Sequence, residues 1–136
     1  MARIVLTDVA VTINSVDLSD HVASVEIAQN FDEVETTAFG DGGRTRVAGL
    51  EDSTLSFSFH QDFEAASVDA TIGPIVGTVV PFSVEPVDGA AAPDNPHYTG
   101  SCLVTEYTPL NGTVGDLSTA DVTWPVVGKV TRDVGA

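Results

Sequence analysis

The stretch from Phe31 to Phe63 reads FDEVETTAFGDGGRTRVAGLEDSTLSFSFHQDF, and its last third carries the clearest strand pattern in the chain. From Ser53 to His60, Leu55, Phe57 and Phe59 alternate with small or polar residues. Because successive side chains of a strand point to opposite faces, this spacing places three large apolar groups on one side of a sheet. The sequence therefore predicts a half-buried strand over 53–60.

The segment before that strand is charged and rich in glycine. Residues 32–39 contain Val34 and two threonines but also three acids, which suits only a wet or partner-covered strand. The connection of about ten residues that follows is long for a hairpin, where two to five are usual. We predict that it is an arm with a loop at about 39–50 that docks on a neighbouring subunit; the alternative is a flexible surface loop. The predicted arm residues are Phe39, Gly40, Asp41, Gly42, Gly43, Arg44, Thr45, Arg46, Val47, Gly49 and Leu50.

The composition favours short strands and turns over long helices. The chain has 136 residues with 12 Gly and 7 Pro, and this length suits one domain over 1–136. Period-two segments recur without alternating helices. These features predict a mainly β fold, an antiparallel β-sandwich or barrel of about seven strands with one short helix and a long hairpin arm.

Six further segments complete this prediction. We expect strands at 4–14 and 23–27, joined as a hairpin through a tight turn at 14–17, and further strands at 78–85, 97–108 and 122–126, with a tail from Gly128. Phe63, Ala66 and Ala70 recur at helical spacing, which predicts the helix over about 63–75. Pro81 favours an edge or a bulge for its strand. The predicted core consists of Val11, Ile13, Val25, Ile27, Leu55, Phe57, Phe59, Phe82, Val84, Val122 and Trp124.

The charge is strongly acidic. Twenty acids oppose five bases, for a net charge of −15, and no base occurs between Arg46 and Lys129. A protein that binds nucleic acid needs Lys and Arg to replace condensed counterions, so this charge argues against a bound polyanion. Simple solubility or a salt-tolerant source would also explain such acidity.

The residues that could carry chemistry are scattered. His21, His60 and His97 lie far apart, and no phosphate loop, His-Glu-x-x-His helix or nucleophile elbow is present. Cys102 is the single cysteine and is interpreted as a small core residue. We therefore expect no enzyme, no cofactor and no metal. The chain start predicts no signal peptide, and no segment predicts a membrane span.

Several runs resemble the small tail tube (major tail) proteins of long-tailed, siphovirus-type phages, particularly those that infect actinobacteria. In the first half these runs are VDLSDHVASV (16–25), DEVETTAFGD (32–41) and GLED (49–52). In the second half they are DFEAASVDA (62–70), TEYTPL (105–110) and VGDL (114–117). The similarity covers nearly the whole chain and consists of structural residues rather than a catalytic signature.

The resemblance implies a virion subunit that assembles with itself into stacked, usually six-fold rings around a negatively charged channel for DNA ejection. In that family a long hairpin loop reaches between rings, and here the matching stretch is 39–50. The implied partners are copies of the chain and the tape measure, terminator and distal tail proteins, with DNA passing through unbound and no membrane. The implied location is the virion tail, after assembly in the host bacterial cytoplasm.

Other roles stay open at this level. Related phage proteins of this size are also minor tail, tail-completion or capsid-decorating subunits. A carbohydrate- or host-binding β-sandwich is a further alternative, and it would expose clustered aromatic side chains.

Overall fold

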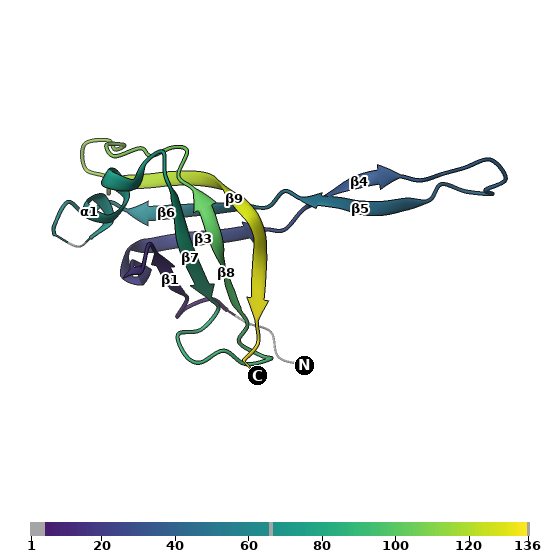
Figure 1. The fold of residues 1–136 in the computed structure, drawn as a ribbon. Coiled ribbons are helices and arrows are strands. Elements are labelled where there is room, and N and C mark those ends of the chain that lie inside the picture. Colours follow the sequence, from purple (N-terminus) through teal and green to yellow (C-terminus); the bar gives the residue numbers. More distant parts are fainter. Residues whose placement is uncertain (1–4, 66, 136) are drawn as a thin grey trace.

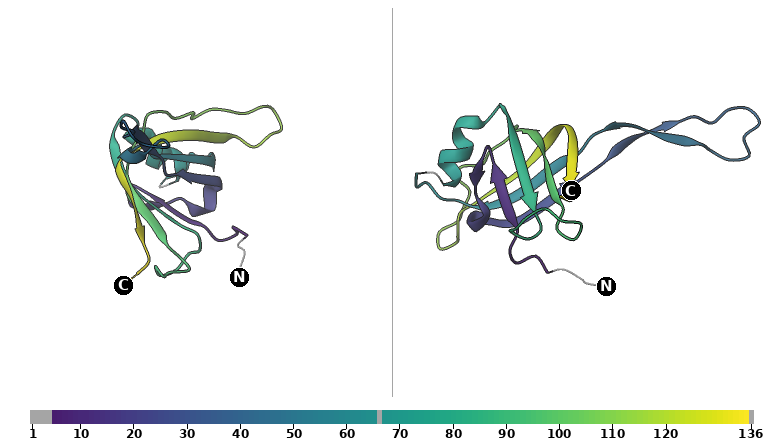
Figure 2. Two further views of the ribbon diagram at one scale, coloured as in Figure 1. Left: turned by 90° about the vertical axis from the view of Figure 1, so that its right-hand side faces the viewer. Right: turned by 60° about the horizontal axis from the view of Figure 1, so that its bottom comes forward.

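The computed structural model describes residues 5–65 and 67–135. It consists of a body, built on a seven-stranded antiparallel sheet that curls into a half-barrel, and a two-stranded arm that projects from it (Figures 1 and 2). The elements are β1 (Ala10–Ile13), β2 (Val16–Asp17), η1 (Ser19–His21), β3 (Val22–Ala28), β4 (Phe31–Glu35), β5 (Arg46–Glu51), β6 (Thr54–His60), α1 (Val68–Ile72), η2 (Gly73–Ile75), β7 (Val79–Glu85), β8 (His97–Leu103) and β9 (Thr119–Asp133). The predicted mainly β fold with one short helix is confirmed.

The order of strands in the body is β2-β1-β7-β8-β9-β6-β3. Strand β9 joins the two halves of this sheet, because its first part pairs with β6 and its second part with β8. The register with β8 shifts between Thr99 and Ser101, where the sheet turns over the core. The tail predicted from Gly128 is wrong, since β9 continues to Asp133 and Val130 is buried within it.

The core fills the concave side of the half-barrel. On β6, Leu55, Phe57 and Phe59 are buried while the residues between them are only partly covered. Phe57 contacts Phe59 with ring centroids 5.4 Å apart and Trp124 edge-on at 5.9 Å, a geometry that aromatic pairs favour. Of the other residues assigned to the core from sequence, Val11, Ile13, Phe82, Val84, Val122 and Trp124 are buried, whereas Val25 and Ile27 are partly buried and pack against its edge.

The predicted hairpin between the first two strands does not form. Strand β1 pairs with β2 and β7, while β3 pairs with β6 on the opposite edge of the sheet. Asn14 and Ser15, both with positive φ, make the tight turn into β2. After it, the buried Leu18 and η1 carry the chain across the open side of the half-barrel. Alternation sets which face of a strand is buried but leaves its partner undetermined.

The helix is shorter than predicted. Helix α1 begins at Val68 and gives way to the 3₁₀ turn η2 at Gly73, just before Pro74. Its buried side chains are Val68, Thr71 and Ile72, whereas Phe63 and Ala70 are exposed. The predicted helical spacing therefore named the wrong face. Ile4 and Ala66, which the predicted elements included, lie outside the described residues.

Pro81 lies inside the sheet and not at its edge. Strand β7 runs between β1 and β8, but Pro81 stands just past the end of β1, where its carbonyl accepts a hydrogen bond from the Asn14 N–H at 2.9 Å. In antiparallel strands the N–H and C=O of one residue point to the same side. An N–H at position 81 would therefore point away from β8, into the space past the end of β1. Proline at this position costs the sheet no hydrogen bond between β7 and β8.

Candidate subunit interface

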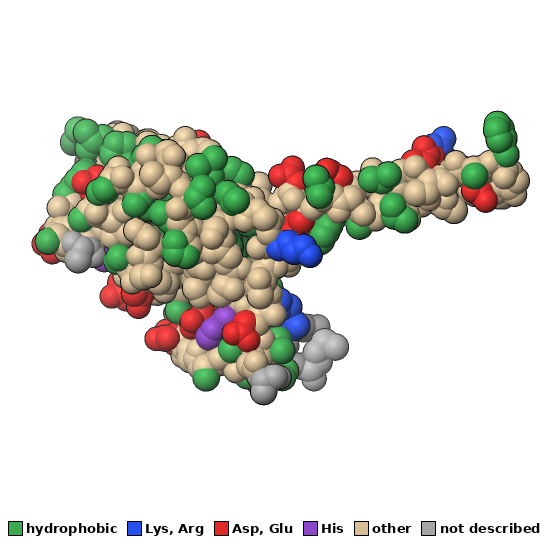
Figure 3. All heavy atoms as spheres, viewed as in Figure 1, with side chains coloured by type: hydrophobic (Ala, Val, Ile, Leu, Met, Phe, Trp, Pro, Cys, Tyr) green, Lys and Arg blue, Asp and Glu red, His purple; other side chains and the backbone are tan. Residues whose placement is uncertain are grey.

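The arm, residues 31–51, stands clear of the body (Figures 1 and 3). Every residue from Phe31 to Leu50 except Gly49 is exposed, and Phe39 near the tip is fully exposed. An isolated two-stranded hairpin is at best marginally stable in water. The arm therefore depends on polar contacts between its own residues.

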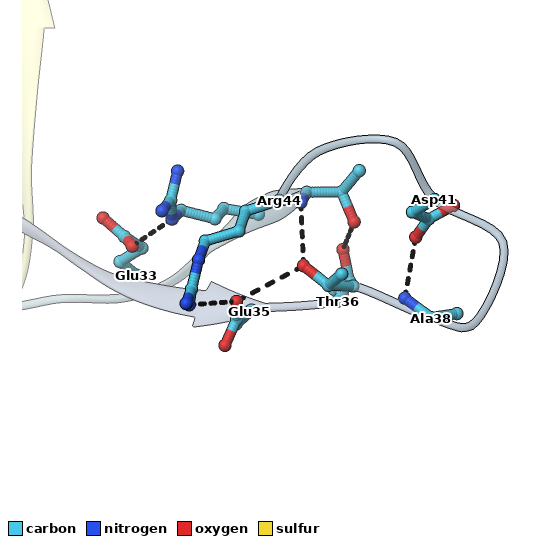
Figure 4. Close-up of polar contacts among 9 residues, drawn as sticks. Glu33, Glu35, Thr36, Ala38, Asp41 and Arg44 are labelled. Carbon is cyan, nitrogen blue, oxygen red and sulfur yellow. Dashed lines mark hydrogen bonds and ion pairs between the residues drawn. The ribbon is translucent and has the colours of Figure 1, made fainter.

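Two diagonal ion pairs connect strands β4 and β5 (Figure 4). Arg44 Nη1 lies 2.8 Å from Glu35 Oε1, and Arg46 Nε lies 2.5 Å from Glu33 Oε1. Further out, the Thr36 N–H donates to the Thr45 carbonyl at 2.8 Å, and the hydroxyls of these two threonines are 2.9 Å apart. Both arginines of the arm therefore have partners within the arm itself.

The tip is an ordered turn. The Ala38 N–H donates to Asp41 Oδ2 at 2.7 Å (Figure 4). The Asp41 N–H donates to the Ala38 carbonyl at 3.2 Å. Gly40 between them has φ +93°, which a residue with a side chain rarely adopts. The Thr45 N–H donates to Thr37 Oγ1 at 3.0 Å and closes the loop behind the turn. These hydrogen bonds fix the backbone on both sides of the exposed Phe39 side chain.

The root of the arm is fastened to the body by Glu51. Its Oε2 accepts hydrogen bonds from the Ser53 hydroxyl at 2.6 Å and from the Val130 N–H of β9 at 2.9 Å. These two bonds, with a smaller contribution from nearby Lys129, hold the pKa of Glu51 below its usual range. The Asp52 N–H adds a bond to the Asn30 carbonyl at 2.7 Å. These bonds fasten the base of β5 to the body.

A bulge in β5 lies just above the root. Phe31 pairs with Glu51 but Glu33 pairs with Ala48, so β5 carries one extra residue between these pairs. A Cβ at Gly49 would lie 3.1 Å from Val34 Cγ2 and 3.3 Å from the Asp32 carbonyl oxygen. A side chain at this position would therefore be tight and would make the neighbouring strand shift slightly, so glycine suits the close approach of the two strands.

The arm differs from its sequence prediction in one respect. The strand over 53–60 was taken as the second half of the hairpin, with 39–50 as the loop, but β6 belongs to the body and β4 pairs with β5. The loop spans 36–45, and Arg46, Val47, Gly49 and Leu50 belong to β5. The sequence did hold a signal for this pairing. Glu33 and Glu35 are two residues apart, and so are Arg44 and Arg46. With this equal spacing, the two glutamates can form ion pairs with the two arginines across an antiparallel pair of strands.

Sequence analysis missed a second exposed apolar region, in the loop between β8 and β9. Leu110, Val114 and Leu117 are exposed there. The base of the loop is fixed to the body, since the Trp124 indole N–H donates to the Glu106 carbonyl at 2.9 Å and the Tyr107 hydroxyl donates to Asp69 Oδ1 at 2.9 Å. The absence of periodicity in this segment gave no indication of its exposure.

A cluster around His21, in the described part of the chain, resembles a catalytic relay but does not have its geometry. Asp62 Oδ2 lies 2.8 Å and Ser67 Oγ 3.3 Å from the same atom, His21 Nε2. A hydrolase relay uses the two different ring nitrogens for its acid and its nucleophile. Hydrogen bonds from the Glu64 N–H, the Ser67 hydroxyl and His21 lower the pKa of Asp62. The cluster therefore ties η1 to the segment before α1.

Cys102 is buried, and desolvation raises its pKa to about 11, so it carries no thiolate near neutral pH.

Within residues 5–65 and 67–135 no group of three His, Cys, Asp or Glu side chains is placed to hold a metal ion. Among the helices of these two ranges, none has the length and apolarity to cross a membrane.

Comparison with known proteins adds evidence on the fold. No protein-family model and no curated protein matches the sequence. Solved structures do share the fold, including the following two. A chain in the virion of a native gene transfer agent (GTA) particle superposes with a TM-score of 0.71 at 15% identity, over 92% of this chain and 95% of that chain. A chain in the tail of an empty GTA particle with C6 symmetry gives 0.65 at 16% identity, over 82% and 81%.

Proposed function

We propose that this chain is a structural subunit of a phage-type tail that self-assembles into stacked, six-fold rings forming a tail tube. The observation that carries the proposal is the arm, a fully exposed hairpin on a body whose fold recurs in a GTA virion and in a C6-symmetric GTA tail. A structural role also agrees with the absence of a relay geometry at His21 and with the inert Cys102.

The arm supports a role between subunits. Every residue of the arm from Phe31 to Leu50 except Gly49 is exposed, so its apolar side chains gain little from burial in a free monomer. The hydrophobic effect favours covering Phe39, Val34, Val47 and Leu50 in an assembly. In a stack of rings, an arm of this kind would bridge from one subunit to the next.

The acidity supports a conduit. A channel that conducts DNA must not retain it, and a subunit with net charge −15 repels phosphate. In this proposal DNA passes through during ejection without specific binding. The other partners are the tape measure, terminator and distal tail proteins of a siphovirus-type tail, and the subunit is assembled in the bacterial cytoplasm and resides in the virion.

Electron microscopy of the purified, concentrated protein tests the proposal. We expect tubes or stacked rings, and we expect more of them as salt rises, because screening weakens the repulsion between copies of charge −15. Class averages of end views give the ring symmetry. Protein that stays monomeric at all concentrations and salt levels would overturn the proposal, and single closed rings that never stack would favour a tail-completion role.

A further inference from the structure

We propose that the arm docks through the face that carries Val34 and Val47, and that a second copy of this chain covers that face. This inference rests on the self-assembly proposed above and identifies the surface that makes it. The opposite face, which carries both arginines, stays in contact with solvent.

The strand register divides the arm into two faces. Glu33 pairs with Ala48, Val34 with Val47, and Glu35 with Arg46. Residues directly opposite each other in an antiparallel pair project to the same face, and neighbours along a strand project to opposite faces. One face therefore holds Glu33, Glu35, Arg46 and Ala48, and the other holds Val34 and Val47.

The charged face is already satisfied. Arg46 reaches Glu33 and Arg44 reaches Glu35, so each arginine has a carboxylate partner on its own face (Figure 4). All four side chains remain about half exposed or more. Covering this face would remove four solvated charges from water, and the desolvation cost of an ion pair often exceeds its Coulombic gain. Docking through the charged face is therefore the costlier choice.

The opposite face is nearly neutral. Val34 and Val47 are 46% and 54% exposed and directly opposite each other. Next to them, the hydroxyls of Thr36 and Thr45 bond to each other, which satisfies one of their two O–H donors and leaves one hydroxyl for a partner to accept from. Gly49 has no side chain, and Asp32 at the root is the one charged residue of β4 on this face. Covering it buries apolar surface at little polar cost.

The charge of the chain explains why a second copy fits this face. Every copy carries 20 acids against 5 bases. Against the charged face, the acids of a second copy would meet Glu33 and Glu35, whose arginines are already engaged. On the face of Val34 and Val47, the carboxylate of β4 and β5 that they meet is that of Asp32. A basic partner would gain from the charged face instead, so the preference for the neutral face is specific to an acidic partner.

Val47 and Ala48 give a matched pair of variants, since they are adjacent, exposed and on opposite faces. Val47→Asp and Ala48→Asp add the same charge at the same distance from the root. We expect Val47→Asp to raise the protein concentration needed for assembly by about tenfold or more, and Ala48→Asp to change it by less than about threefold. Melting temperature and circular dichroism of both variants should match those of the unchanged protein.

Thiol labelling of assembled protein provides the second measurement. Val47→Cys should lose its reaction with maleimide on assembly and Ala48→Cys should keep it, while buried Cys102 contributes no background. If the unchanged protein assembles but Ala48→Asp is the disruptive variant, or both or neither disrupt, the assignment of the docking face is wrong while self-assembly stands. If the unchanged protein does not assemble, the proposed function fails together with this inference.

Discussion

The body and the arm are built from the same kinds of strands but are stabilised in different ways. Strand β6 alternates buried and partly buried residues against a shared core, whereas all five residues of β4 are exposed. The body is held by apolar burial and the arm by ion pairs, threonine contacts and one carboxylate at its root. Substitutions in the body should therefore change stability, and substitutions in the arm should change assembly.

The largest effect on stability is expected in the body. Phe57→Ala removes a buried ring from contact with Phe59 and Trp124 and should cost about 3–5 kcal/mol of unfolding free energy. Urea unfolding followed by tryptophan fluorescence measures it. Phe39→Ala is the control from the arm and should leave the midpoint unchanged, because that ring contacts solvent. Equal effects of the two variants would contradict the division between body and arm.

Shortening the arm should separate assembly from stability. Replacing residues 36–45 by Asn-Gly joins Glu35 directly to Arg46 through a two-residue turn, which suits a hairpin. Loop-closure entropy changes slowly with length, so unfolding free energy should change by less than about 1 kcal/mol. Sedimentation velocity should show that the shortened protein no longer forms higher assemblies. If the shortened protein still forms tubes of normal length, residues 36–45 are not needed for assembly.

The hydrogen bonds that Glu51 accepts at the root of the arm should weaken at low pH. The pKa of Glu51 is lowered in the folded protein, so its contribution is complete above the unfolded value of about 4.3 and is lost as pH falls through the folded value. Glu51→Gln should remove this dependence. Protection of the Val130 amide against hydrogen exchange reports the bond directly. Because Asp17 and Asp62 also have lowered pKa values, global melting would mix the three contributions.

Asp52→Asn is the control for that experiment. It removes one adjacent charge but leaves the bonds from Ser53 and Val130 to Glu51 in place. It should therefore keep the pH dependence of the Val130 amide. Protection that is independent of pH in the unchanged protein would show that the carboxylate does not fasten the arm.

The smallest expected effect is on DNA. Neither the monomer nor its assembly should retard duplex DNA in a gel at low salt, where electrostatic binding is strongest. The reason is the interval without a base between Arg46 and Lys129, together with the pairing of the arm arginines to glutamates. A shift that disappears as salt rises would mean that a basic surface forms in the assembly.

The sequence by itself determined the buried face of the strands with the clearest alternation, although it placed Val25 and Ile27 too deep and missed Val130. The period of two in β6 and in the first part of β9 marked Leu55, Phe59 and Trp124, because alternation alone assigns a side chain to one face of a sheet. It also marked the exposed, charged character of the arm, because three acids within 32–39 cannot be buried without partners.

Only the tertiary structure decided which strands pair. Strand β3 crosses to β6, β1 turns to β7, and β4 pairs with β5 and not with the strand of phenylalanines. Pairing depends on contacts between distant parts of the chain, and several partners satisfy the same alternation. The two faces of the arm emerged only from its register, since a shift of one residue would exchange Val47 and Ala48 between them.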